Sequence, residues 1–142
     1  MMTRDEMDAV LDAHFRAEAA KDLDGVLATL TEDAEHDAVG FPVAVLNDHE
    51  AIRERYVELF EGLVDDKVEP VRRYHGDGFV VDECVITGRV DGIMLGIPGE
   101  GRTVSFRLLH VCEFRDGKMS RENVWMDAIA ILAQLGAFPA AA

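Results

Sequence analysis

The side chains best suited to chemistry lie in two stretches of the C-terminal half, residues 106–110 and 123–127. Between them, Asp-Gly at 116–117 is a strong signal for a two-residue hairpin turn, which would pair Arg115 with Lys118. The opposed pairs that follow from this turn are Phe106 with Asp127, Leu108 with Trp125, and His110 with Asn123. Directly opposed side chains share one face of a sheet, so we expect a carboxylate, an imidazole and an amide together on a mostly apolar face.

The same register places Glu122 on the opposite and more exposed face, together with Arg107, Glu113 and Ser120. Successive strand residues point to opposite faces of a sheet. A one-residue bulge near the turn would therefore reverse the facing along one strand. The face assignment depends on regular pairing from the turn onward.

Asp127 is the candidate acid–base group of the apolar face. A carboxylate among apolar groups has its charged form disfavoured, so it can exchange a proton with a carbon acid near neutral pH. The other interpretation is an N-cap for a helix over residues 128–135, because Asp directly precedes that segment. The two roles are compatible, but the cap alone would explain the residue.

His110 is the second candidate catalytic residue. It could donate a hydrogen bond to a substrate oxygen or orient Asp127, although a buried structural histidine is the more common outcome on an apolar face. Asn123 could bind a carbonyl group or merely satisfy His110. Trp125 is expected to form core or pocket wall rather than a specific binding group.

Four more residues are expected around the same pocket. Phe106 and Leu108 share the apolar face and would supply surface for a hydrophobic substrate. His36 and Asp37 are neighbours in a short strand, so only one of them is expected to face inward. His14, on the first helix, could also reach the pocket.

The elements that must position these residues are helical in the N-terminal half and extended in the C-terminal half. Thr3 and Glu6 form a capping box for a helix that runs to about Lys21, and Asp22 caps a short second helix. A further capping box at Asn47 begins a third helix. The remaining expected elements are strands over 34–39, 68–74, 79–91, 103–115 and 118–126, a loop over 92–101, and a closing helix over 128–135.

This segregation of helices and strands predicts an α+β fold in a single domain over residues 1–142. A flat antiparallel sheet could not cover the apolar faces of the helices. A cone-shaped barrel, in which a curved antiparallel sheet wraps around the N-terminal helices, could do so. Such a cone leaves a pocket between the sheet and the helices, where small molecules commonly bind.

The bulk composition excludes several classes of partner. Asp and Glu outnumber Lys and Arg by 28 to 14, which gives a formal net charge of −14. Such a surface repels phosphate groups, so we expect no binding to nucleic acid or anionic membranes. No apolar run approaches the roughly 20 residues of a membrane span, and no signal-peptide pattern is present, so a cytoplasmic location is expected.

A metal site is not expected from the spacing of possible ligands. Cys84 and Cys112 have no short-spaced partner and are expected to be buried, reduced thiols. None of the five histidines forms a short-spaced pair with another histidine or cysteine.

Several segments together resemble the SnoaL-like polyketide cyclases, a family of the nuclear-transport-factor-2-like superfamily. The segments are Leu30-Thr31-Glu32-Asp33-Ala34, Gly96-Ile97-Pro98, residues 101–106, Phe114-Arg115-Asp116-Gly117-Lys118, Trp125-Met126-Asp127 and Gln134-Leu135-Gly136. The resemblance implies an α+β cone, a homodimer, and no metal or organic cofactor. It also implies a pocket aspartate as acid and base, at the position of Asp127, in ring closure by intramolecular aldol condensation.

The chain departs from the patterns of this superfamily at positions that carry catalytic residues in its members. The family ending has Trp directly before Asp, whereas Met126 separates Trp125 from Asp127 here. Ketosteroid isomerases of the same superfamily carry a Tyr donor and a general-base Asp, and these positions fall on His14 and Ala38 here. Steroid isomerisation by that mechanism is therefore disfavoured.

The leading hypothesis is a SnoaL-like enzyme that performs acid–base chemistry on a hydrophobic carbonyl compound, by enolisation with aldol-type cyclisation or isomerisation. One alternative is a non-catalytic domain of the same fold that binds a small molecule or dimerises. Another is a hydrolase or dehydratase that uses a pocket carboxylate and histidine.

Overall fold

The first helix begins where the capping pattern predicts it. In the computed structural model, which describes residues 1–139, helix α1 spans Arg4–Ala19. The Thr3 hydroxyl accepts from the Glu6 amide, and the Glu6 carboxylate accepts from the Thr3 amide, so the predicted capping box is confirmed. The buried residues of α1 recur at helical spacing and form one face toward the sheet: Met7, Leu11, His14 and Ala17.

Three shorter helices follow. Asp22 caps α2 (Leu23–Ala28), as predicted. Helix α3 (His49–Gly62) is capped by Asp48, whose carboxylate accepts from the amide of Ala51, so the predicted capping box at Asn47 is wrong by one position. Helix α4 spans Ala128–Gln134.

The second half of the chain forms a meander of four long antiparallel strands. They are β2 (Leu63–Gly76), β3 (Phe79–Val90), β6 (Arg102–Arg115) and β7 (Lys118–Met126). The predicted loop over 92–101 contains a short two-stranded ladder of β4 (Ile93–Met94) and β5 (Ile97–Pro98).

The first strand, β1 (Leu30–Val39), joins this meander at its far edge and runs parallel to β7. The sheet order is therefore β1-β7-β6-β3-β2, and the sheet is mixed rather than purely antiparallel as predicted. The parallel register pairs His36 with Glu122 and Ala38 with Val124. Strand β1 begins four residues before its predicted start at Ala34.

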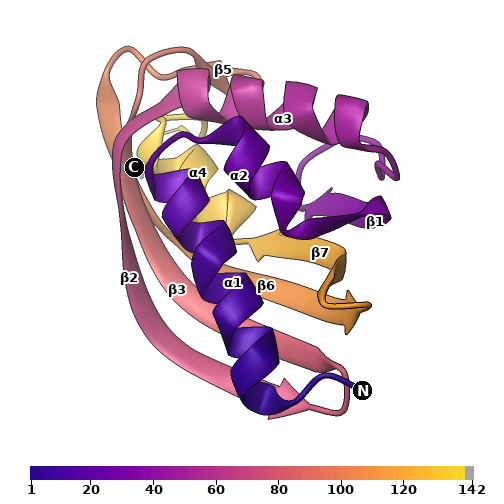
Figure 1. The fold of residues 1–142 in the computed structure, drawn as a ribbon. Coiled ribbons are helices and arrows are strands. Elements are labelled where there is room, and N and C mark those ends of the chain that lie inside the picture. Colours follow the sequence, from indigo (N-terminus) through magenta and orange to yellow (C-terminus); the bar gives the residue numbers. More distant parts are fainter. Residues whose placement is uncertain (140–142) are drawn as a thin grey trace.

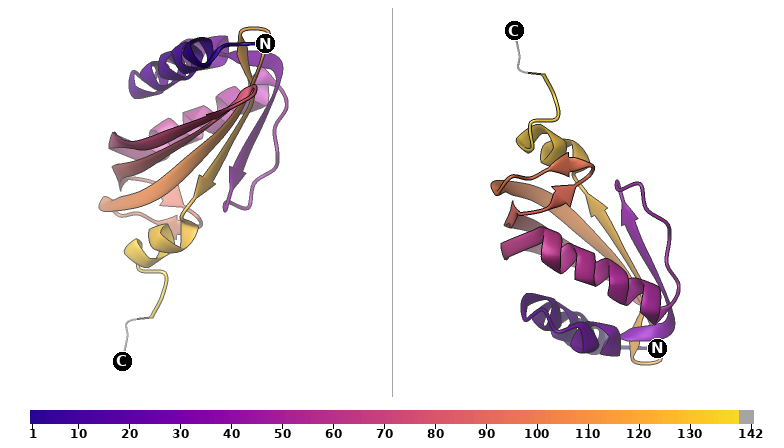
Figure 2. Two further views of the ribbon diagram at one scale, coloured as in Figure 1. Left: turned by 90° about the horizontal axis from the view of Figure 1, so that it is seen from below. Right: turned by 90° about the horizontal axis from the view of Figure 1, so that it is seen from above.

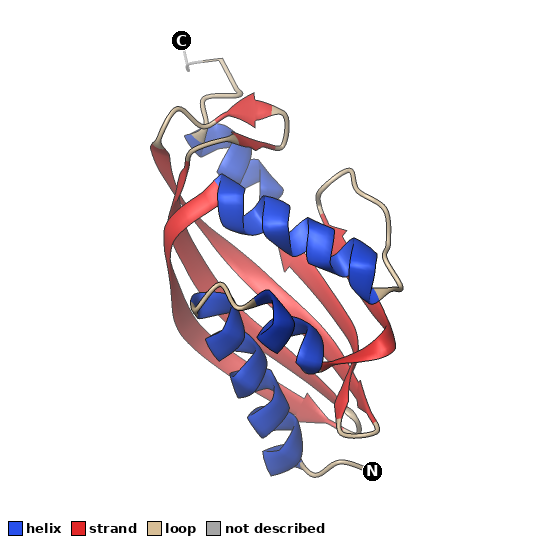
Figure 3. Cartoon of the chain, turned by 45° about the horizontal axis from the view of Figure 1, so that its top comes forward, coloured by secondary structure: helices blue, strands red, loops and turns tan. Residues whose placement is uncertain are grey.

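The sheet is strongly curved, and helices α1, α2 and α3 lie on its concave side (Figures 1 and 3). The further views show the same two layers, with α4 and the β4–β5 ladder together at one end of the sheet (Figure 2). This open, cone-like α+β arrangement agrees with the predicted fold class. No helix of the described residues is long and apolar enough to cross a membrane.

The apolar core has two parts. One lies under α1 and α2 and includes Met7, Leu11 and Leu30 against Val80 and Cys112 of the sheet. The other lies toward α4 and is made by Leu63, Val90, Val104, Phe106, Leu108 and Ile131. Several buried polar side chains lie among these apolar residues, including His14, His36, His110 and Glu122.

The turn between β6 and β7 forms as predicted, but the register does not continue regularly from it. Asp116 and Gly117 both have positive φ, as a tight hairpin requires, and Arg115 pairs with Lys118. After the pair Phe114–Met119 the register shifts by one residue, so that Glu113 pairs with Arg121 and Ser120 is the extra residue. This bulge reverses the facing of the rest of β7 relative to the regular hairpin.

Candidate functional site

The bulge at Ser120 corrects the predicted composition of the concave face. His110 pairs with Val124 rather than Asn123, and Leu109 rather than Leu108 pairs with Trp125. Phe106, Leu108 and His110 keep their predicted inward facing. On β7, Met126 pairs with Leu108, Val124 pairs with His110, and Glu122 pairs with Cys112, so these three β7 residues share that face. The carboxylate on the concave face is therefore Glu122, which the regular register had placed on the outside.

The bulge places Asn123 and Trp125 on the outer face of the sheet, away from the cavity. Trp125 is 52% exposed on the outer face, so it is not a wall of the pocket. Asn123 is buried on that outer face and donates to Glu35 at 2.8 Å. The expectation that Asn123 and Trp125 lie beside His110 in the pocket is wrong.

Asp127 lies at the start of α4 and is exposed. Its Oδ1 accepts from the amide of Ala130 at 3.0 Å, which is the geometry of an N-cap. It is not among the residues that line the cavity described next. The expected desolvated setting for Asp127 is therefore wrong, and the capping interpretation describes its contacts.

A cavity of about 290 Å³ lies between the concave face of the sheet and α3. This volume is near the lower end of the range of roughly 300–1,000 Å³ for small-molecule sites. Most lining side chains are apolar, and they include Phe41, Leu59, Phe60, Leu63, Ile86, Met94, Phe106, Leu108, Val124 and Met126. The predicted lining residues Phe106, Leu108, His36 and His110 are all present, whereas His14 is not.

Four lining residues are both polar and buried, and we call them the polar wall of the cavity: His36, Tyr56, His110 and Glu122. They come from β1, α3, β6 and β7. Glu122 is only 1% exposed. A buried carboxylate requires partners, and those of Glu122 are on the helices.

Tyr56 and His14 hold Glu122 in place. The Tyr56 hydroxyl lies 2.7 Å from Oε1 of Glu122 and 2.8 Å from Oε1 of Glu18. Nε2 of His14 lies 2.9 Å from Oε2 of Glu122 and 2.9 Å from Oε1 of Glu18. Two helices and one strand thus bring two carboxylates, a phenol and an imidazole together.

The hydrogen bonds fix the charge of His14. The Thr29 hydroxyl donates to the carbonyl of Val26 at 2.7 Å, so it accepts from Nδ1 of His14, which is also 2.7 Å away. Nε2 faces carboxylate oxygens and therefore carries a proton as well. Burial lowers the pKa of His14, but the charges of Glu122 and Glu18 outweigh it and raise this pKa to about 10.

The pKa values of Glu122 and Tyr56, which both contact His14, shift in opposite directions. Burial raises the pKa of Glu122, but the His14 cation outweighs burial, and the net pKa is below its usual value. Burial raises the pKa of Tyr56 well above its usual value, and both carboxylates add to that shift. At neutral pH this group therefore holds a carboxylate at Glu122 and a protonated phenol at Tyr56.

His36 is a neutral imidazole whose tautomer is set by Arg55. Nη1 of Arg55 donates to Nδ1 of His36 at 3.1 Å, and an arginine cannot accept a proton in return. The proton of His36 is therefore on Nε2, which lies 3.9 Å from Oε1 of Glu122. Burial lowers the pKa of His36, with an added contribution from Arg55 and an opposing one from Glu122.

Replacing Arg55 with methionine is expected to raise the pKa of His36 and to let its neutral ring carry the proton on either nitrogen. The reason is that the substitution removes both a neighbouring cation and the donor to Nδ1. Imidazole nitrogen shifts measured by NMR across a pH titration would detect both effects. Arg53→Met is the matched control, because Arg53 is on the same helix and pairs with the exposed Asp24. Equal His36 titration in the two variants would contradict the assignment.

His110 has a different environment from His36. Its ring packs against Phe15 with 4.8 Å between ring centroids, and its Nδ1 has no hydrogen-bond partner among residues 1–139. Burial lowers the pKa of His110, against the charges of Glu18 and Glu122. Both cysteines are buried and free, and burial raises the pKa of Cys84 to about 12.

Sequence reasoning found part of this site. The inward facing of His110 was predicted, and His36 was one of two neighbours of which one was expected to face inward. Glu122, Tyr56, Glu18 and Arg55 were missed as site residues. Tyr56 is buried, and its hydroxyl was the available signal, because a buried phenol requires a partner.

Comparisons with known proteins agree with this architecture. A family model described as SnoaL-like polyketide cyclase matches residues 8–135. No curated protein sequence matches the chain.

Similar solved structures include TsrD from Streptomyces laurentii, with a TM-score of 0.83 and 20% identity over 97% of this chain and 100% of that one. A candidate SnoaL-like polyketide cyclase from Jannaschia sp. CCS1 has a TM-score of 0.84 and 19% identity over 98% and 99%. An NTF2-like protein from Burkholderia xenovorans LB400 has a TM-score of 0.76 and 19% identity over 95% and 99%. At these identities the likeness establishes the fold.

Proposed function

The chain belongs to the SnoaL-like polyketide cyclase family, and from this premise we propose that it catalyses enolisation of a hydrophobic carbonyl compound, with Glu122 as the proton acceptor. The observation that carries the proposal is the fully buried Glu122 carboxylate in the polar wall of an otherwise apolar cavity. A charged group in such a position is uncommon unless it has paired partners or a chemical role.

The geometry supplies both groups that enolisation needs. Oε1 of Glu122 accepts the proton from the carbon next to the carbonyl. Nε2–H of His36, 3.9 Å from that oxygen, donates to the carbonyl oxygen as negative charge develops on it. The two groups are adjacent in space, as the carbon-bound hydrogen and the carbonyl oxygen are adjacent in the substrate.

The charge of His14 sets which carbon acids this base can use. Because the pKa of Glu122 is lowered, its carboxylate is a weak base, and it matches substrates whose carbon–hydrogen bond is already acidic. A carbon between two carbonyl groups is such an acid. We therefore propose β-dicarbonyl compounds with an apolar body as the substrate class.

The proton removed by Glu122 has two possible destinations. If it returns to the carbon skeleton at another position, the reaction is an isomerisation. If the enolate carbon attacks a second carbonyl of the same molecule, a carbon–carbon bond forms, and the new alkoxide takes the proton. The second outcome is an intramolecular aldol cyclisation. Binding of the folded substrate in the apolar cavity would hold its two reacting carbons close together.

Deuterium uptake from D₂O into a bicyclic β-keto ester of the tetralone type tests the proposal. The expected result is faster exchange at the carbon between the carbonyls than in a protein-free blank, with saturation at increasing ester concentration. Inhibition of the same exchange by a non-enolisable analogue would indicate that the exchange takes place in a binding site. Mass spectrometry of the recovered ester measures the label.

Two other results would favour the alternatives. Saturable binding of the ester without faster exchange would favour a binding domain of the same fold. Release of an alcohol or loss of water from the ester without prior exchange would favour a hydrolase or dehydratase. Either result would count against Glu122 as an enolising base.

A further inference from the structure

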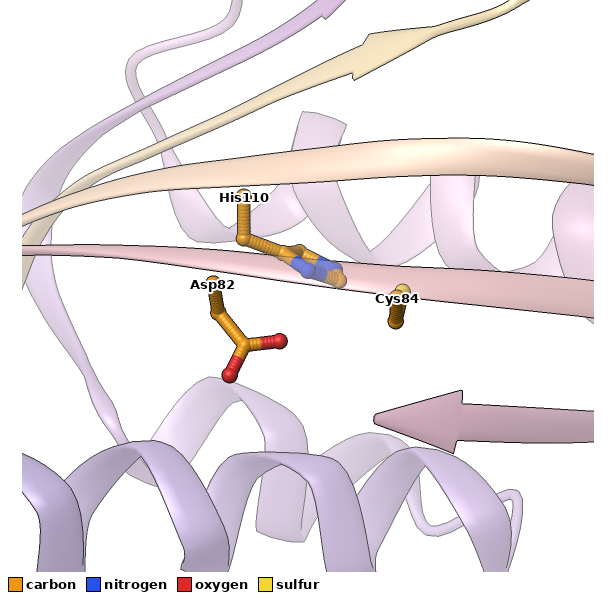
Figure 4. Close-up of side chains that lie close together, drawn as sticks. All are labelled: Asp82, Cys84 and His110. Atoms are coloured by element: carbon orange, nitrogen blue, oxygen red, sulfur yellow. The ribbon is translucent and has the colours of Figure 1, made fainter. Parts of the chain in front are cut away.

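A second group of chemically active side chains, on β3 and β6, shares His110 with the polar wall and adds Asp82 and Cys84. Asp82 and Cys84 are two residues apart on β3 and so share a face, and Asp82 is directly opposite His110 on β6. All three are buried, and one donor atom from each lies within 4.8 Å of the other two. Figure 4 shows the three side chains gathered together, with the His110 ring between Asp82 and Cys84 in that view.

The group contains a polar atom that its protein neighbours leave unpaired. Nδ1 of His110 is buried and accepts or donates no hydrogen bond within the described part of the chain. Phe15 packs against the ring and limits its rotation. Buried polar atoms are almost always paired, so this ring nitrogen, beside a carboxylate and a thiol, is a candidate ligand atom.

The charges around the group favour a cation. Arg73 donates to Asp82 at 2.9 Å and so holds that carboxylate in position. The same guanidinium also binds Asp8 at 2.9 Å and Asp12 at 3.0 Å. Three carboxylates thus surround one guanidinium, and the neighbourhood keeps an excess of negative charge that a divalent ion would offset.

We propose that Asp82, Cys84 and His110 bind a single divalent transition-metal ion of the Zn²⁺ type. Thiolate, imidazole and carboxylate together suit Zn²⁺, whereas Mg²⁺ and Ca²⁺ prefer sets of oxygen ligands. Tetrahedral coordination places ligand atoms about 3.3–3.8 Å apart, which small side-chain rotations can reach from the present separations. On binding, the Cys84 thiol gives its proton to solvent as the metal–sulfur bond forms.

The polar group around His14 is a weaker candidate for the same ion. His14, Glu18 and Glu122 are also close enough to share a metal. Their charges already balance in part, because His14 is a cation between the two carboxylates, and both of its ring nitrogens have hydrogen-bond partners. That group also lacks sulfur, which gives an experiment a way to tell the two locations apart.

Cobalt titration of the chelator-treated full chain tests the proposal. Co²⁺ is a coloured substitute for Zn²⁺, and a cysteine ligand adds a thiolate-to-cobalt charge-transfer absorption in the near ultraviolet. We expect saturation at one ion per chain, with this absorption present and with loss of the colour on addition of Zn²⁺. Cys84→Ala should remove the absorption and weaken binding by more than the roughly 10- to 100-fold that loss of an outer hydrogen-bonding partner costs.

Cys112→Ala is the matched control, because Cys112 is the other buried free thiol and lies on the neighbouring strand. It should bind Co²⁺ with the charge-transfer absorption intact. Asp82→Asn gives a second test that keeps the hydrogen bond from Arg73, and it should weaken binding without loss of the circular dichroism of the fold. Absence of saturable binding, binding without the thiolate absorption, or loss of that absorption in Cys112→Ala would each overturn the site.

Discussion

Replacing Glu122 by glutamine is expected to lower the rate of deuterium exchange by roughly 10²- to 10⁴-fold, the usual contribution of a positioned general base. Glutamine keeps the size of the side chain and can still accept from the Tyr56 hydroxyl, which lies 2.7 Å from the carboxylate. It cannot take a proton from carbon. The loss should therefore appear in kcat, with a smaller change in KM.

Asp127→Asn is the matched control for this variant. Asparagine caps a helix about as well as aspartate, so the bond to the amide of Ala130 and the stability of α4 should be retained. Exchange is expected to stay within a factor of about two of the unmodified protein. The reverse pattern, with Asp127→Asn inactive and Glu122→Gln active, would return the catalytic role to Asp127.

Glu122→Asp tests whether the loss of exchange in Glu122→Gln results merely from the loss of a buried negative charge. It keeps the charge opposite His14 but withdraws the carboxylate by one methylene group. A protein that is folded by circular dichroism and has weakened exchange would show that the position of the carboxylate matters. Full exchange in a folded Glu122→Gln protein would exclude Glu122 as the base.

Replacing His14 by glutamine is expected to lower the free energy of unfolding by about 3–5 kcal/mol, the typical effect of removing one partner from a buried ion pair. The substitution leaves Glu122 and Glu18 facing each other without the cation that lies 2.9 Å from both. Urea unfolding near neutral pH measures the change. His75→Gln is a useful comparison, since His75 is less buried and lies 2.7 Å from the single carboxylate of Asp8, and it should cost about 1 kcal/mol or less.

The pH dependence of stability gives a second signature of the same pair. The pKa of His14 rises from 6.5 to about 10 on folding, so its contribution is complete below pH 6.5 and is lost as the pH rises through 10. The pKa of Glu122 is lowered from 4.5, so its contribution is complete above pH 4.5 and is lost on acidification. Both contributions are complete between pH 4.5 and 6.5. A His14→Gln protein with the same loss of stability toward pH 10 as the unmodified protein would contradict this account.

The sequence predicted the elements better than it predicted the site, and β7 shows why. The hairpin turn was visible because its two residues adopt positive φ, which Asp-Gly tolerates. The extra residue at Ser120 was not visible, because bulge formation depends on how the whole strand fits its two neighbours. One such residue was enough to exchange Asn123 and Trp125 for Glu122 and Val124 on the concave face.

The contacts behind the cavity were hidden for a different reason. His14, Thr29, Tyr56 and Glu122 lie far apart in the chain, and only the packing of α1 and α3 on the sheet brings them together. Periodicity identified the buried faces of these helices but could not pair their polar atoms across elements. The parallel pairing of the edge strand β1 was also not predictable from local patterns, because its partner β7 is far from it in the sequence.

That pairing of the first strand with the last has a consequence for how the protein is made. Residues 30–39 leave the ribosome well before residues 118–126. Apart from the single bridge between His36 and Leu46, their partner in the sheet of the described residues is that late segment. His36 and Glu122 face each other across this junction, so no shorter nascent chain can contain the assembled polar wall. Completion of the sheet and creation of the site are therefore one late event in synthesis, and an amino-terminal fragment released early would expose an unpaired strand edge to aggregation.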